Sequence, residues 1–283
     1  MDLPQIYMNI ALVIISELIY FVHFGANSSL AFKSNDMIGL FIVFKGIGSG
    51  HMSAETLRIF IGFDPRETVA FNVLQHSISR RASRPVSIIP LALNQLSALM
   101  WRERNPLQST DFSFSRFLTP YLSGFTGWSL FMDCDMLVLD DVAKLFDLCD
   151  DRYAVQVIKH EHNPSEDVKF LGAVQTKYEK KNWSSVMLFN NSKCQKLTPD
   201  YVNTASGLEL HQFKWLDDDS LIGEIPHRWG HLVDYDPQVP AEDVSLIHFT
   251  IGGPYFDEYR DCGYADLWFA ERDSMLTCAQ RGK

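Results

Sequence analysis

Two aspartates, Asp133 and Asp135, flank Cys134 directly after the apolar run 128–132. Such a run is typical of a buried β-strand, so we expect both carboxylates at the end of that strand. Carboxylate oxygens are the ligands that Mg²⁺ and Mn²⁺ prefer, and these cations also bind phosphate oxygens. In open α/β sheets, ligands bind at the carboxyl ends of the strands. Asp-x-Asp triplets are also frequent in turns, so the triplet alone leaves a metal site and a plain turn both open.

Three other side chains have both a structural and a chemical interpretation. Asp64 follows the predicted strand 57–63, where it would cap a helix or contact the base or ribose of a nucleotide. Arg116 stands among apolar residues, so it is either exposed on an amphipathic helix or buried with a carboxylate or phosphate partner. His248 lies in the predicted strand 245–250, either as a packed core residue or as a third metal ligand.

The elements that would position these side chains alternate between strands and helices, which indicates an α/β fold. Residues 57–81 are predicted as strand, tight turn and helix, the opening of a nucleotide-binding unit, because Asp64, Pro65 and Glu67 form a good helix start. The aspartates 217–219 precede an apolar run, as at a helix N-terminus. Further strands are predicted at 85–93, 128–132, 153–158, 183–190 and 245–250, and further helices at 96–104, at 113–122 with a break near Pro120, and at 140–147.

The composition excludes some classes of protein. The chain has 283 residues, which suits one domain of about 230 residues with an appendage. The net charge of −10 argues against a nucleic-acid partner. The five cysteines are odd in number and scattered, without a Cys-x-x-Cys pair, so they predict a reducing compartment and a cytoplasmic location.

The first part of the chain is unlike the rest. The run 6–22 is apolar but contains Asn9, Ser16 and Glu17, and it is at the short limit for a bilayer span. We therefore predict an extension over 1–52 that is a weak membrane anchor, a linker or non-native sequence, and a catalytic domain over 53–283. Most of 159–181 is polar and is interpreted as an active-site loop.

Taken in order, these motifs resemble those of GT-A glycosyltransferases, most closely the retaining glycosyltransferase family 8 type, over roughly 57–255. The resemblance covers nearly all of the chain after the extension. The segments that resemble family motifs are Ile59-Phe-Ile-Gly-Phe-Asp64, Phe114-Ser-Arg116-Phe, Phe131-Met-Asp133-Cys-Asp135, Trp183-Ser-Ser-Val-Met-Leu-Phe-Asn190, Asp217-Asp218-Asp219 with Ile225-Pro-His-Arg-Trp229, and His248-Phe-Thr-Ile-Gly-Gly.

The resemblance implies a GT-A (nucleotide-diphospho-sugar transferase) fold, with a mixed, mostly parallel central sheet flanked by helices. It implies a hexosyltransferase that moves a sugar with retention from a nucleotide-sugar, UDP-linked, to a carbohydrate or lipid-linked acceptor. In that family pattern, Asp133, Asp135 and His248 are the ligands of Mn²⁺ or Mg²⁺. The residues beside the donor are Asp64, Arg116 and Gly252. The residues near the transferred sugar are Asp217, Asp218 and Asp219, and Asp218 is the nucleophile to test.

The chain also departs from the family pattern. Trp183-Ser184-Ser185 replaces the Asn-Ala-Gly that lines the sugar pocket, and Asp218 stands where the family often has Gln. Gly253-Pro254-Tyr255 replaces a closing Lys-Pro-Trp, so the family's phosphate-binding lysine is absent. The donor sugar and the shape of its pocket are therefore left open.

Three rival functions remain. A sugar nucleotidyltransferase needs a glycine-rich loop after the first strand, whereas Gly62-Phe-Asp-Pro-Arg66 has one glycine. A phosphohydrolase of the Asp-x-Asp-x-Thr type would have Thr where this chain has Leu137. A non-catalytic binding protein on the same fold is the third possibility, because a fold does not imply a function.

Overall fold

The computed structural model describes residues 56–104, 108–160, 168–169, 173–174 and 180–277. The extension predicted over 1–52, with its apolar run 6–22, lies outside the described residues, as does most of the loop predicted over 159–181. Within the described ranges, no helix is both long enough and apolar enough to cross a membrane.

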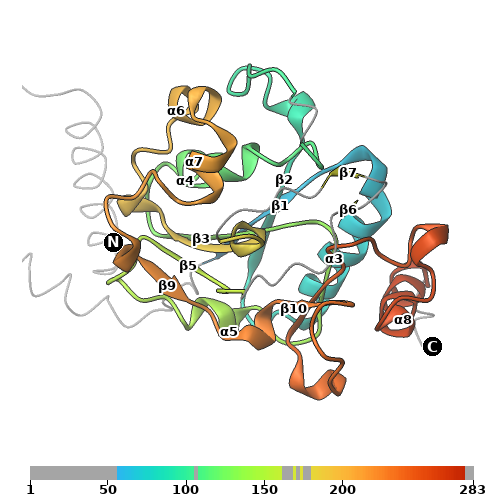
Figure 1. The fold of residues 1–283 in the computed structure, drawn as a ribbon. Helices are drawn as coiled ribbons and strands as arrows, with labels where there is room; N and C mark the ends of the chain where they lie inside the picture. Colours follow the sequence, from blue (N-terminus) through green and yellow to red (C-terminus); the bar gives the residue numbers. More distant parts are fainter. Residues whose placement is uncertain (1–55, 105–107, 161–167, 170–172, 175–179, 278–283) are drawn as a thin grey trace, which may run out of the picture. The chain divides into compact units, whose positions relative to one another are not determined.

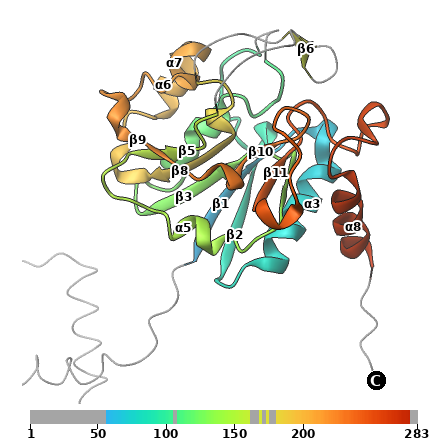
Figure 2. The ribbon, with the colours of Figure 1, turned by 60° about the horizontal axis from the view of Figure 1, so that its bottom comes forward.

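A sheet of six strands forms the centre of the fold, in the order β2-β1-β3-β8-β5-β9 (Figures 1 and 2). Strand β8 runs antiparallel to both of its neighbours, and the other pairings are parallel. This confirms the predicted mixed, mostly parallel sheet. The strands are β1 (Leu57–Gly62), β2 (Val86–Leu91), β3 (Trp128–Met132), β5 (Val155–Val157), β8 (Val186–Asn190) and β9 (Ile222–Glu224).

A second sheet has three strands, β10 (His231–Leu232), β11 (Leu246–His248) and β4 (Met136–Val138). Strand β11 is parallel to β10 and antiparallel to β4. Because β4 begins just after β3 ends, the Asp133-Cys134-Asp135 turn connects the two sheets. A third, antiparallel pair consists of β6 (Val168–Lys169) and β7 (Ala173–Val174).

Figure 1 shows α4, α6 and α7 on one side of the large sheet, and α3 and α8 on the other. The α-helices are α3 (Thr68–Arg81), α4 (Thr119–Leu122), α5 (Ala143–Phe146), α6 (Pro199–Thr204), α7 (Gly207–His211) and α8 (Ala265–Leu276). Short 3₁₀ helices span Pro65–Glu67, Leu93–Gln95, Ser115–Leu118, Trp183–Ser185, Asn191–Lys193, Asp219–Leu221, His227–Trp229, Ala241–Asp243 and Asp257–Tyr259.

The helix predicted over 96–104 is wrong. After β2 the chain makes the 3₁₀ turn Leu93–Gln95, and within 96–104 it forms only a single hydrogen-bonded turn at 97–99. The side-chain oxygen of Asn203 in α6 accepts hydrogen bonds from the backbone amides of Trp101 and Arg102, at 2.8 and 2.9 Å. These amides are therefore satisfied by a tertiary contact, which overrides local helix propensity.

Two other helix predictions are adjusted by the structure. The predicted helix 113–122 consists of a 3₁₀ turn followed by α4, and Pro120 lies in the first turn of α4, where no amide hydrogen is needed. The aspartates 217–219 lead into a single 3₁₀ turn and then β9, not into a regular helix.

Helix α8 is attached to α3 through a buried charge cluster. Glu271 is 3% exposed and lies 2.8 Å from Arg81, 2.6 Å from His76 and 3.5 Å from Arg80. Burial by itself would raise the pKa of Glu271, but the hydrogen bonds from Arg81 and His76 and the charges of Arg81 and Arg80 lower it overall. A buried carboxylate with cationic donors stabilises the fold only while it is ionised.

Replacing Glu271 with Gln should therefore lower the free energy of unfolding by about 2 kcal/mol at neutral pH, because charge-assisted hydrogen bonds are lost. The pKa of Glu271 is lower in the folded state than its usual value near 4.5. The advantage of the wild type over Glu271→Gln should be complete above that value and shrink as the pH falls through the folded pKa. Urea unfolding of both proteins at a series of pH values measures this, and a pH-independent difference would contradict it.

Candidate functional site

The Asp133-Cys134-Asp135 turn is fixed at the carboxyl end of β3. The amide of Asp133 donates to the carbonyl oxygen of Ser185 at 3.0 Å, which continues the pairing of β3 with β8. Cys134 is fully buried, whereas Asp133 and Asp135 are partly exposed, with side chains 14% and 17% accessible. The turn thus presents both carboxylates on the accessible side of the chain, as the sequence predicts.

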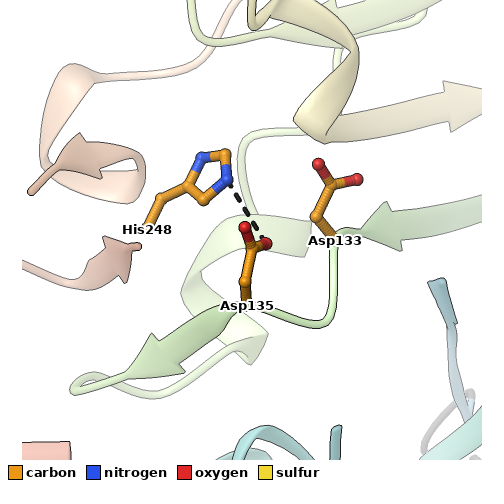
Figure 3. A group of neighbouring side chains, drawn as sticks. All are labelled: Asp133, Asp135 and His248. Carbon is orange, nitrogen blue, oxygen red and sulfur yellow. Dashed lines mark ion pairs between the residues drawn. The ribbon is translucent and has the colours of Figure 1, made fainter. Parts of the chain in front are cut away.

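His248 reaches these carboxylates because β11 pairs with β4. His248 is opposite Met136, and the amide of Phe249 donates to the carbonyl oxygen of Asp135 at 2.9 Å. As a result, Nε2 of His248 lies 3.3 Å from Oδ1 of Asp135. Figure 3 shows the three side chains converging from the end of β3, the start of β4 and the end of β11.

These three side chains are suited to a divalent cation. One ligand atom from each of Asp133, Asp135 and His248 lies within 4.8 Å of the other two. Apart from the 3.3 Å contact with His248, no hydrogen bond reaches the buried Oδ1 of Asp135 from the described residues, and none reaches Nδ1 of His248. A buried carboxylate oxygen without a hydrogen-bond donor is costly unless a cation satisfies it. Two carboxylates and one imidazole form a donor set that accommodates Mn²⁺ or Mg²⁺.

Arg116 is buried with a carboxylate partner, as one of its two interpretations predicts. Its guanidinium lies 2.9 Å from Oδ1 of Asp133 and donates to the carbonyl oxygen of Ser184 at 2.8 Å. The rings of Phe112 and Phe131 lie 5.2 and 5.1 Å from its guanidinium carbon. Arg116 therefore orients Asp133. A contact of Arg116 with the donor stays a prediction.

Asp64 acts as a helix cap. Its carboxylate is 1% exposed and accepts hydrogen bonds from the amide and guanidinium of Arg66 and from the amide of Asp111. Burial raises the pKa of Asp64, but these hydrogen bonds and the charge of Arg66 lower it overall. The capping interpretation is confirmed, and a contact with the nucleotide stays a prediction.

The aspartates 217–219 are exposed and precede β9. Asp218 caps the 3₁₀ turn through Ser220, and Asp219 lies 2.6 Å from Lys180. When the register of the sheet is followed from β9 across β5 and β8 to β3, Ile222 at the start of β9 lies level with Ser129 of β3. The backbone of β9 therefore begins at the opposite end of the sheet from Asp133. The role of these aspartates at the transferred sugar stays a prediction.

Gly252 is buried with φ of +153°, and a Cβ there would lie 2.4 Å from the ring of Tyr259. The glycine therefore allows the segment after β11 to pack closely against Tyr259. Its predicted contact with the donor stays untested.

Two residues near the site were not predicted from the sequence. Glu67 is 3% exposed, and burial and the charge of Asp135 raise its pKa to about 8, although the hydrogen bond from the Tyr255 hydroxyl opposes this shift. The sequence marks Glu67 only as part of a helix start, since Tyr255 is 188 positions away. His211 lies 2.8 Å from Oγ of Ser184, one of the serines that depart from the family pattern.

The topology and the site together define a GT-A glycosyltransferase fold. The galactosyltransferase LgtC in complex with donor and acceptor sugar analogs superposes with a TM-score of 0.50 at 13% identity, over 79% of this chain and 98% of that chain. The bifunctional glycosyltransferase WbbM has a TM-score of 0.49 at 14% identity, and the match covers 95% of this chain and 63% of WbbM.

At the level of sequence, the similarity is much higher to a plant protein. The chain is 47% identical to Protein CDI of Arabidopsis thaliana over 232 residues, which is 80% of this chain and 89% of the relative. The chain therefore belongs to the Protein CDI family. No model of a protein family matches the chain.

Substituting Leu for Arg116 should lower the free energy of unfolding by about 3 kcal/mol, because Asp133 would lose the cation that compensates its partial burial. Chemical denaturation measures the effect. Arg152→Leu is a matched control, because Arg152 pairs with Asp150 at the exposed surface, where an ion pair contributes little to stability. Equal stabilities of the two variants would contradict the assigned role of Arg116.

Proposed function

We propose that this protein is a glycosyltransferase that takes a sugar from a nucleotide-sugar with the help of Mn²⁺ or Mg²⁺. The observation that carries the proposal is the convergence of Asp133, Asp135 and His248 to within 4.8 Å, at the carboxyl end of β3 in a GT-A fold. Ligands of open α/β sheets bind at this end. The proposal includes the reducing, cytoplasmic location that the scattered cysteines of the sequence predict.

Each residue has a definite part in this proposal. Asp133, Asp135 and His248 hold the cation, and Arg116 keeps Asp133 oriented toward it. When bound, the cation stabilises the negative charge that develops on the departing nucleoside diphosphate. The remaining assignments are the ones that the family resemblance implies: a UDP-linked hexose, retention, and a carbohydrate or lipid-linked acceptor, with Asp64 and Gly252 beside the donor.

The structure also bears on the rival functions. A sugar nucleotidyltransferase would use the turn after β1 to surround phosphates with backbone amides. Here a Cβ on Gly62 would lie 2.3 Å from the ring of Phe112, and Arg66 pairs with Asp64 in the same turn. Phe112 and the ion pair fill the space beside this turn, which favours the transferase over the nucleotidyltransferase.

The metal-dependent step can be tested with Asp135, which is a better target than Asp133 because Asp133 also neutralises Arg116. In calorimetry with Mn²⁺, the wild type should bind UDP, and EDTA should abolish binding. Asp135→Asn should weaken Mn²⁺-dependent binding more than about 100-fold, because it replaces an anionic ligand with a neutral amide. Asp200→Asn, at an exposed position on α6, is the control and should bind like the wild type. Equal UDP affinity with and without metal would refute the proposal.

The family resemblance implies Asp218 as the candidate nucleophile in the set 217–219, although β9, which follows this set, begins at the opposite end of the sheet from Asp133. If its carboxylate attacks the sugar, Asp218→Asn should lower kcat for donor hydrolysis about 100-fold or more while KM changes little. The loss of its cap at Ser220 should lower the stability only slightly, because Asp218 is exposed. A change in kcat of less than about twofold, well below a catalytic effect, would remove Asp218 from the mechanism.

A further inference from the structure

Glu67 is a buried carboxyl group that contacts both chain segments that bear the candidate metal ligands. It ends the 3₁₀ turn that precedes α3. Its Oε1 accepts a hydrogen bond from the hydroxyl of Tyr255 at 2.8 Å. Its Oε2 lies 3.7 Å from Sγ of Cys134, which donates to it.

The two hydrogen-bond partners of Glu67 belong to the two chain segments that bear the candidate metal ligands. Cys134 is the residue between Asp133 and Asp135, so its side chain fixes the turn that presents both carboxylates. Tyr255 belongs to the segment that follows His248 at the end of β11. One carboxyl group therefore joins the two parts of the chain, more than a hundred positions apart, whose spacing decides whether three ligands meet at one point.

A contribution to stability alone does not explain why the carboxyl group of Glu67 is buried here. Glu271 is equally buried, at 3%, but its hydrogen-bond partners are two arginines and a histidine. Glu67 instead receives its hydrogen bonds from a phenol and a thiol, neither of which carries a positive charge. Burying an acid with uncharged donors beside Asp135 costs free energy, and such arrangements are concentrated at functional sites.

Tyr255 is also a departure of this chain from the pattern that it resembles. It stands in Gly253-Pro254-Tyr255, where a closing Lys-Pro-Trp is expected. Tryptophan has no hydroxyl group with which to make the bond to Glu67. The connection between Glu67 and Tyr255 thus depends on residues particular to this sequence.

We propose that Glu67 is a positioning residue for the divalent cation: its hydrogen bonds to Cys134 and Tyr255 hold the Asp133–Asp135 turn and the segment after His248 at the spacing that metal binding requires. This inference rests on the proposed function, since it concerns the same site. Residues that orient metal ligands from outside the coordination sphere typically contribute about 10- to 100-fold to metal affinity.

The test is a titration of the full chain with Mn²⁺ alone. Electron paramagnetic resonance distinguishes the free from the bound ion and so measures the affinity. Glu67→Ala should bind Mn²⁺ about 10- to 100-fold more weakly than the wild type. Tyr255→Phe, which removes only the hydroxyl, should weaken binding about tenfold. Glu67→Gln should remain within about threefold of the wild type, because the amide carbonyl still accepts from Tyr255.

Two matched controls separate positioning from general damage. Tyr264→Phe removes another buried hydroxyl, which donates to the carbonyl oxygen of Val239 at 2.7 Å, and Glu271→Ala removes the other buried glutamate. Both should bind Mn²⁺ like the wild type. If Glu67→Ala does not fold, the comparison of Tyr255→Phe with Tyr264→Phe decides the question.

The outcomes distinguish this inference from the proposed function. A wild type that binds no Mn²⁺ would overturn the metal site, and with it both proposals. A wild type that binds Mn²⁺ while Glu67→Ala and Tyr255→Phe bind equally well would overturn only the role of Glu67. Equal losses in Glu67→Gln and Glu67→Ala would show that hydrogen bonding to Tyr255 is not how Glu67 acts.

Discussion

The antiparallel pairing of β11 with β4 is the constraint on which the candidate site depends. Strand β4 begins immediately after the Asp133-Cys134-Asp135 turn, and β11 returns beside it with His248 opposite Met136. Because side chains alternate along a strand, a shift of one residue in this register would turn His248 away from Asp135. The amide of Phe249 fixes the register by its hydrogen bond to the carbonyl oxygen of Asp135.

Electrostatics set the second condition. Two aspartates at the end of one strand repel each other, and burial increases the effect. Arg116 offsets the charge of Asp133 from inside the core, where it lies near the rings of Phe112 and Phe131. Among the residues that the structure describes, Asp135 pairs with His248 at 3.3 Å, and its buried oxygen receives no hydrogen bond. A cation bound between the three side chains would supply the positive charge that Asp135 lacks.

Much of this arrangement could be predicted from the sequence, because it depends on local signals. Runs rich in apolar and β-branched residues predicted β1, β3, β5, β8 and β11. Asp64 and Pro65 predicted the start of the first helix. The cost of burying a guanidinium predicted a carboxylate or phosphate partner as one of two interpretations of Arg116, and Asp133 is that partner.

The remainder depends on contacts between distant residues. Nothing local to 96–104 reveals that Asn203 takes the amides of Trp101 and Arg102. Helix α8 buries Trp268 and the charged Glu271, so its buried face does not have an apolar pattern. Glu67 is similar, since its importance becomes visible only when the fold brings the 3₁₀ turn before α3 to Tyr255 and Cys134.

The central claim is that Asp133, Asp135 and His248 hold a divalent cation. The most direct measurement is anomalous diffraction at the manganese absorption edge from a crystal grown with Mn²⁺ and UDP. We predict one strong anomalous peak about 2.0–2.3 Å from a carboxylate oxygen of each aspartate and from Nε2 of His248, next to the diphosphate. Bound UDP with no manganese peak between these three side chains would contradict the claim.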